Sequence, residues 1–176
     1  LKNHDLSVRA FYKRMFRMPT FNDLYYTDMG NAFLKPEYAE QFNVGLKYTR
    51  NFEKSPFMRM LDVSVDAYYN KITDKIIAYP KGQQFRWTML NLGEVEIKGV
   101  DAVLNTQFSL GKLEVTTKFQ YTYQEAIDVT DPADTYYRDQ IPYIPWHSGS
   151  AILALFYKGW GLNYSFIYTG QRYNQQ

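Results

Sequence analysis

The chain has 176 residues, the length of one domain or of a segment of a larger one. It contains no cysteine, which excludes disulfides, thiolate catalysis and cysteine-ligated metals within this sequence. A formal net charge of +2, with no run of Lys or Arg, gives no indication of a nucleic-acid-binding face.

Hydropathy excludes a helical membrane protein, because no stretch approaches the roughly 18 consecutive apolar residues that a spanning helix needs. A membrane β-barrel stays possible, since its strands alternate apolar and polar residues and keep the mean hydropathy low, here −0.46. Residues 1–20 lack the pattern of a signal peptide, which means little if the chain belongs to a longer protein.

Alternation with a period of two runs along the whole chain and predicts β-strands. The clearest example is 112–124, where an apolar set from Leu113 to Tyr123 interleaves with a fully polar set. In chain order we predict about eight strands, at 6–16, 38–50, 60–72, 75–80, 85–108 with interruptions at Gly93 and Gly99, 112–126, 146–157 and 160–170. The third and fourth can also be one long strand. No segment has a convincing helical period, so the predicted fold is all-β.

The connections between these strands alternate in size, as they do in outer-membrane barrels. Tight turns are predicted at Ser109–Lys112 and Lys158–Gly159, and longer loops at Thr27–Lys35, Tyr79–Arg86 and Ile127–Pro142. Asn51–Met60 is long for a tight turn. The predicted architecture is an antiparallel up-and-down meander that forms part of a transmembrane barrel.

Side chains divide between the two faces of these strands. The acids and bases expected to face the lumen are Asp62, Asp66, Lys112, Glu114 and Lys118, because a Lys or Arg facing mid-bilayer lipid would cost about 2–4 kcal/mol. Aromatic residues gather at strand ends, where they favour membrane girdles over an ordinary core. Outer-membrane lipid is therefore an expected partner.

Several short segments then match a known pattern in order. They are Arg17, Pro19, Phe21, Leu24 and Tyr25, then Gly30-Asn31, Leu34 to Glu37, Glu40 to Gly45, Val65 to Asn70 with Thr73 to Ile77, Asn91 to Gly93, Ile97 to Asp101, and Tyr168 to Tyr173. Together they resemble the C-terminal part of the barrel of TonB-dependent outer-membrane receptors, with spacing most like that of the vitamin B12 and siderophore receptor group. Asp101 replaces the family's usual Glu.

This resemblance implies a barrel of about 22 strands, of which the chain supplies roughly strands 12 to 19. The plug domain, the TonB box, the first half of the barrel and its final strands are then expected outside residues 1–176. The implied function is energy-coupled uptake of a scarce ligand, such as a siderophore, cobalamin, haem or a glycan, across the outer membrane of a Gram-negative bacterium. The TonB complex is the implied partner.

The motif residues are predicted to have structural roles in turns: Arg17, Pro19, Leu24, Tyr25, Gly30, Asn31, Leu34, Pro36, Glu37, Asn91, Gly93, Lys98 and Gly99. Residues 17–26 are expected to leave the barrel wall. Gly30-Asn31, which tolerates positive φ, and Pro36, which lacks a backbone donor, then reverse the chain.

Candidate ligand contacts are aromatic residues in or near the loops: Tyr25, Tyr26, Tyr79, Trp87, Tyr136 and Tyr137. Each could instead belong to a girdle. The acids Asp128, Asp131, Asp134 and Asp139 could bind calcium, but their uneven spacing favours a hydrated loop. His4 and His147 have no nucleophile or metal-spaced partner near them, so we expect no enzyme activity, metal or cofactor.

Two other functions are compatible with the pattern. A passive outer-membrane barrel of about eight strands would need its first and last strands to close on each other. An extracellular β-sandwich that binds glycans through Tyr and Trp would be soluble without detergent.

Overall fold

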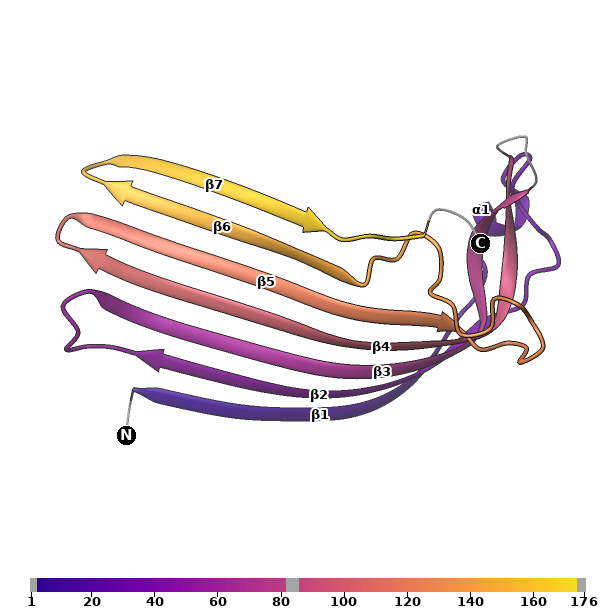
Figure 1. Ribbon diagram of the computed structural model, residues 1–176, viewed down its shortest axis with the longest axis horizontal. Coiled ribbons are helices and arrows are strands. Elements are labelled where there is room, and N and C mark those ends of the chain that lie inside the picture. Colours follow the sequence, from indigo (N-terminus) through magenta and orange to yellow (C-terminus); the bar gives the residue numbers. More distant parts are fainter. Residues whose placement is uncertain (1–2, 82–85, 174–176) are drawn as a thin grey trace.

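A computed structural model describes residues 3–81 and 86–173, which form one antiparallel sheet of seven strands arranged in sequence order (Figure 1). The strands are β1 (His4–Arg17), β2 (Glu37–Asn51), β3 (Met58–Lys81), β4 (Arg86–Leu110), β5 (Leu113–Asp128), β6 (His147–Tyr157) and β7 (Trp160–Thr169). Each strand pairs with its neighbour in the chain, and the sheet stays open between β1 and β7. The predicted all-β antiparallel meander is confirmed.

The structure settles or corrects several details of the predicted elements. The strands predicted at 60–72 and 75–80 are the single strand β3, which is the alternative that the sequence left open, so the described residues form seven strands. The predicted interruptions at Gly93 and Gly99 are wrong, because β4 runs through both. Beyond Arg17 the chain leaves the sheet, and α1 (Phe21–Tyr25) forms a helical turn where no helix was predicted. Of the loop predicted at Tyr79–Arg86, positions 79–81 and 86 belong to β3 and β4, and 82–85 lie outside the described residues.

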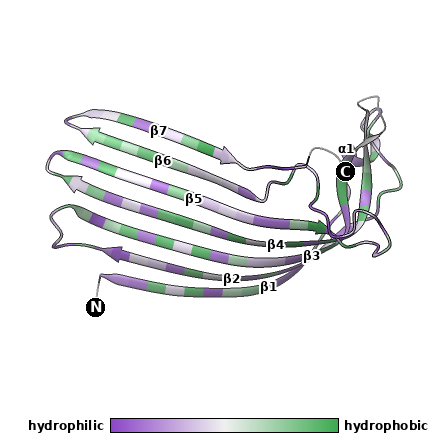
Figure 2. Cartoon of the chain, viewed as in Figure 1, coloured by the Kyte–Doolittle hydropathy of each residue, from purple (hydrophilic) through white to green (hydrophobic). Residues whose placement is uncertain are grey.

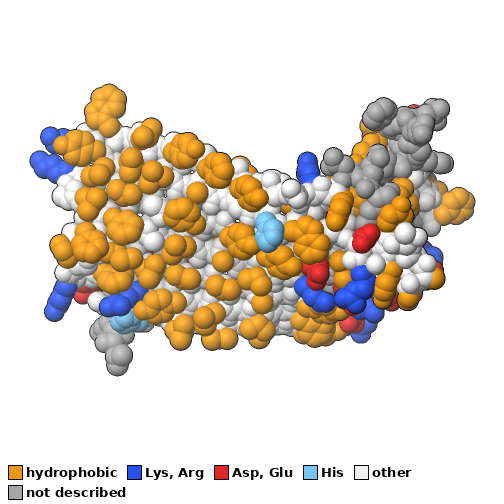
Figure 3. All heavy atoms as spheres, viewed as in Figure 1, with side chains coloured by type: hydrophobic (Ala, Val, Ile, Leu, Met, Phe, Trp, Pro, Cys, Tyr) orange, Lys and Arg blue, Asp and Glu red, His pale blue; other side chains and the backbone are white. Residues whose placement is uncertain are grey.

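Register gives the sheet two chemically different faces, visible as alternating bands along the strands in Figure 2. One row of aligned residues is apolar: Leu6, Tyr48, Val63, Leu104, Phe119, Ala151 and Phe166. We call the face of the sheet that carries this row the outer face. The adjacent row on the opposite, inner face is polar from β1 to β5: Asp5, Thr49, Asp62, Asn105 and Lys118. Figure 3 shows a hydrophobic face whose charged side chains lie toward the two ends.

The connections separate into two classes at opposite ends of the strands (Figure 1). Short connections join β2 to β3, β4 to β5, and β6 to β7; the last is a two-residue turn in which Lys158 (φ 46°) and Gly159 (φ 87°) both have positive φ. We call this the turn end and the opposite end the loop end. The predicted lumen residue Lys112 lies in the β4–β5 turn, not on a strand, because β5 begins at Leu113.

On the inner face, Gly45 makes room for an ion pair that crosses a strand. Arg9 on β1, Gly45 on β2 and Asp66 on β3 are aligned by register. The Arg9 Nε donates to Asp66 Oδ1 at 2.9 Å and Nη2 donates to Oδ2 at 2.6 Å, a bidentate arrangement. A Cβ at position 45 would overlap both side chains, so only glycine allows them to meet above β2.

A small hydrophobic core lies near the loop end. It consists of Ile72, Val95, Ile97, Ala126 and Ile141. Ile141 comes from the β5–β6 connection, which therefore folds back against the ends of β3, β4 and β5. Among residues 3–81 and 86–173, no helix has the length and apolar character needed to span a membrane.

Candidate functional site

The loop end is the candidate site, because the long β1–β2 and β5–β6 connections meet there with the outer part of the β3–β4 hairpin (Figure 1). The first connection, between β1 and β2, contains α1. The N-terminus of this helix has a capping box: the Thr20 side chain accepts from the Asp23 N–H, and the Asp23 carboxylate accepts from the Thr20 N–H. Arg17 lies 3.8 Å from Asp23 and 3.3 Å from Glu37, so it connects the end of β1 to the start of β2.

The chain reversal after α1 depends on a close approach at Gly30. Its N–H donates to the Tyr26 carbonyl at 2.7 Å, and a Cβ at this position would lie 2.6 Å from the Leu24 carbonyl oxygen. Positive φ occurs at Asp28 (67°) and not at Gly30 or Asn31, which corrects the predicted geometry. Glycine is needed here for space and not for backbone rotation.

Asn91 joins the first connection to the β3–β4 hairpin. Its Oδ1 accepts from the Lys35 N–H at 2.9 Å, and its Nδ2 donates to the carbonyls of Lys35 (3.1 Å) and Asp74 (2.7 Å). Asn31 adds a bond from its Nδ2 to the Met89 carbonyl at 3.0 Å. The hairpin and the first connection are therefore one bonded unit.

Glu37 supports the same unit where β3 bends. Asp74 has positive φ (55°), and the N–H of Ile76 just beyond it donates to Glu37 Oε2 at 3.0 Å. The same oxygen accepts from Arg17 Nη2. A motif residue on β2 thus satisfies a backbone donor that the irregularity on β3 sets free.

Replacing Asn91 by aspartate keeps the acceptor for Lys35 and removes both donated bonds. Each ordinary hydrogen bond contributes about 0.5–1.5 kcal/mol, so amide exchange in residues 75–79 and 33–35 is expected to accelerate by about tenfold. Hydrogen–deuterium exchange on the full receptor measures this. Asn105→Asp on the inner face of β4 is the control and should leave the same amides unchanged.

The β5–β6 connection is held by Gln140, which is 1% exposed. Its Oε1 accepts from the Ala126 N–H at 2.8 Å, and its Nε2 donates to the carbonyls of Gln124 and Ile144. The Ile141 N–H donates to the Ala126 carbonyl at 2.8 Å. These bonds continue the pairing of β5 beyond Tyr123, where β6 no longer accompanies it.

The acids of this connection stabilise its turns. The side-chain oxygens of Asp128, Asp131 and Asp134 each accept from the backbone N–H two residues later, at 2.9–3.0 Å. Over the described ranges, no group of three or more His, Cys, Asp or Glu residues is arranged to hold a metal ion. The arrangement is that of a loop ordered by its own backbone contacts.

The six aromatic residues predicted to contact ligand all lie at the loop end, but on separate segments. Tyr25 (58% exposed) contacts the Phe21 ring on α1, and Tyr26 is equally exposed at the end of this helix. Tyr79 lies on the hairpin, and Tyr136 and the half-buried Tyr137 lie in the β5–β6 connection. Within the described residues no ring contact joins two of the six, so their role in binding stays a prediction.

Trp87 has a partner that the sequence did not suggest, since its ring centroid lies 5.9 Å from that of Tyr143. This contact brings the hairpin against the β5–β6 connection. Sequence reasoning also missed Gln140, which lies in a stretch without periodicity. The signal for α1 was present, because Thr20 and Asp23 have the spacing of a capping box.

The two histidines lie on strands and bond to tyrosines. His4 Nδ1 is 2.8 Å from the Tyr48 hydroxyl, and His147 Nδ1 is 2.7 Å from the Tyr121 hydroxyl. His147 also contacts the ring of Tyr123. Both histidines are therefore part of the aromatic contacts of the outer face.

Comparison with known proteins identifies the family. The family model "TonB dependent receptor-like, beta-barrel" matches residues 2–176. A vitamin B12 transporter BtuB of Photobacterium profundum is 29% identical over 177 residues, which cover 97% of this chain and 26% of the relative. A second, of Vibrio vulnificus, is 32% identical over 99 residues, covering 56% of this chain and 14% of the relative.

These matches confirm the resemblance seen in the sequence, including its likeness to vitamin B12 receptors, and the predicted location in the Gram-negative outer membrane. The chain spans only 26% of the first relative's length. With its open seven-stranded meander, its apolar outer face and this match over nearly every residue, the chain belongs to the β-barrel family of TonB-dependent receptors.

Proposed function

We propose that this chain forms part of the wall and mouth of an active transporter that imports a cobalamin-like ligand. The inner face would lie against a plug domain and water, and the loop end would face the outside of the cell. TonB, acting through a part of the protein outside this segment, would supply the energy. The protein binds and releases its ligand and performs no catalysis.

One observation carries the choice of ligand class. The alignment with the Photobacterium vitamin B12 transporter covers 97% of the chain, so it extends through the connections at the loop end as well as the strands. Strands of any barrel must alternate, whereas loops have no such common requirement, so an alignment that continues through the loops supports a related ligand. The bonds through Asn91 and Gln140 support a preformed mouth.

The test uses the full-length gene in a Gram-negative strain that lacks its own cobalamin receptor. Uptake of radiolabelled cobalamin is expected, and it should disappear when TonB is deleted or the proton gradient is collapsed. Uptake without TonB would indicate a passive barrel. Binding of a ferric siderophore or an oligosaccharide in place of cobalamin would reject the ligand class and keep the transporter.

A further inference from the structure

The two ends of the sheet have opposite net charge. The three segments of the turn end contain five bases and two acids, a net charge of +3; they are 50–60, 109–114 and 156–161. The segments of the loop end contain seven bases and nine acids, a net charge of −2; they are 17–37, 74–81, 86–94, 127–147 and 170–173. We call the five turn-end bases the basic rim: Arg50, Lys54, Arg59, Lys112 and Lys158. Figure 3 shows Lys and Arg side chains along this end, at the left.

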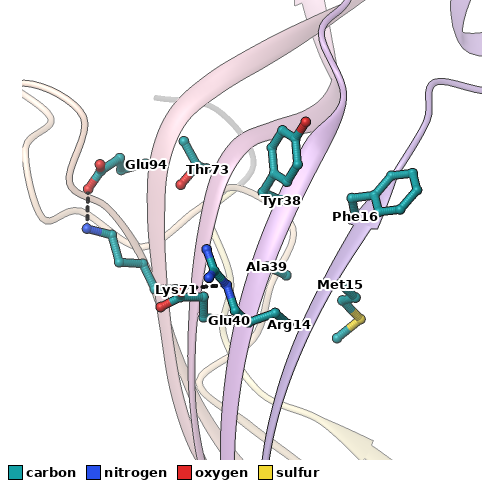
Figure 4. A pocket seen from close by; sticks show the side chains of 9 residues that line it. All are labelled: Arg14, Met15, Phe16, Tyr38, Ala39, Glu40, Lys71, Thr73 and Glu94. Carbon is teal, nitrogen blue, oxygen red and sulfur yellow. Dashed lines mark ion pairs between the residues drawn. The ribbon is translucent and has the colours of Figure 1, made fainter.

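The bases at the two ends also differ in their partners. On the outer face near the loop end, Arg14 Nε lies 3.0 Å from Glu40 Oε1, and Lys71 Nζ lies 2.9 Å from Glu94 Oε2 (Figure 4). These cations are neutralised by their own neighbours. Within the described part of the chain, no base of the basic rim forms an ion pair with a carboxylate. The rim therefore offers its positive charge to a partner other than this segment.

Two bases of the rim lie over aromatic rings at the edge of the outer face. Lys158 Nζ is 5.3 Å from the centre of the Tyr157 ring, and Arg50 Cζ is 4.5 Å from that of Phe52. Register places Tyr157 and Arg50 on the outer face. Long basic side chains keep their apolar stems on such surfaces and their charges in a polar layer. These two charges therefore lie on the side that faces lipid and not in the lumen.

Large apolar side chains accompany the rim on the outer face. Trp160, which pairs with Tyr157, is 83% exposed, and Leu110, beside the turn that contains Lys112, is 54% exposed. Trp and Tyr favour the boundary between hydrocarbon and headgroups in membranes. The rim thus places cations just beyond residues that suit this boundary, at the level where lipid headgroups would lie.

We propose that the basic rim binds the headgroups of anionic phospholipids in the leaflet around the turn end. The lipid phosphates lie among the rim bases, and the acyl chains pass along Trp160 and Leu110 toward the middle of the sheet. Lys and Arg are attracted to an anionic lipid surface, whereas the amine of a zwitterionic headgroup cancels the charge of its phosphate. This inference rests on the membrane placement in the proposed function, with the turn end on the inner side, and not on its ligand.

Lipid retention by the full receptor tests the rim. The receptor is purified in mild detergent, mixed with phosphatidylglycerol and phosphatidylethanolamine of identical acyl chains, and analysed by native mass spectrometry. Wild type should retain the anionic lipid preferentially, and added salt should reduce this preference by screening the charges. Lys54→Gln/Lys112→Gln/Lys158→Gln should lower retention of phosphatidylglycerol by about tenfold or more, because each base near an anionic surface adds to the attraction.

Two matched variants make the result specific. Lys13→Gln/Lys35→Gln/Lys118→Gln removes the same charge from the inner face and the loop end, and should retain lipid as wild type does. Lys54→Arg/Lys112→Arg/Lys158→Arg keeps the charge of the rim and should also behave as wild type does. Heat-modifiable gel migration shows that each variant is folded. If the glutamine variant of the rim does not assemble, the lipid preference of wild type and its salt dependence still decide.

Equal retention of the two lipids by wild type, or an equal loss in the variant that spares the rim, would overturn the proposal. Binding of wild type to isolated peptidoglycan without a preference between the lipids would assign the bases to the cell-wall polymer instead. Cobalamin uptake is measured with the same variants. Lipid preference without cobalamin uptake would reject the ligand class alone, whereas uptake without lipid preference would reject the role of the basic rim alone.

Discussion

Replacing Gln140 by leucine is expected to release the β5–β6 connection from the sheet. Leucine has a similar volume but leaves the Ala126 N–H and the carbonyls of Gln124 and Ile144 without the partners they have now. Ala126 is fully buried, and an unsatisfied buried polar group costs about 1–3 kcal/mol. The loss of several bonds at one residue exceeds what the small core around Ile141 can compensate.

Limited proteolysis and hydrogen exchange of residues 126–146 in the full receptor measure this release. Both should increase by about tenfold or more, while the strands keep their protection. Gln120→Leu is the matched control, because this exposed β5 glutamine is bonded to Ser150 at a longer 3.3 Å. Unchanged protection of the Ala126 amide in Gln140→Leu would show that the connection is held by other contacts.

Replacing Gly45 by alanine should have the second large effect. The added Cβ must displace the Arg9–Asp66 pair, which crosses β2 only because position 45 has no side chain. Overpacking of this kind costs about 1–3 kcal/mol of the free energy of unfolding. Urea unfolding of the receptor reconstituted in lipid vesicles gives this value.

A background that lacks the ion pair isolates the cause. In the Arg9→Ala/Asp66→Ala background, the Gly45→Ala change has no ion pair to displace, so the free energy of unfolding should stay roughly unchanged. A slight increase is also consistent, because alanine restricts the unfolded chain more than glycine does. An equal cost in both backgrounds would place the strain in the β2 backbone instead.

Period-two alternation was sufficient to predict most of the sheet. Each observed strand begins or ends within a few residues of its predicted range, because the lipid face and the polar face impose opposite requirements on successive residues. The sequence left open whether β3 is one strand or two. The ambiguity lies at Asp74, where φ is positive but pairing with β4 resumes at Lys75.

The loop end was much less predictable, since its contacts are specific pairs without a period. The family motif marked Glu37 and Asn91 as structural, and both proved to join the first connection to the hairpin. Nothing local distinguished Gln140 from other polar loop residues, because its role depends on Ala126, 14 positions away. The sequence around Tyr143 likewise did not predict its contact with Trp87.

The two-residue turn at Lys158–Gly159 has a consequence for how the gene can change length. Because both residues have the backbone twist that a tight hairpin requires, the turn directly sets which residue of β7 faces Tyr157. One inserted codon would exchange the lipid and lumen faces of Trp160–Thr169, whereas two would restore them. Insertions and deletions among relatives are therefore expected to have even numbers of residues at the turn end. An epitope tag is better inserted at the loop end.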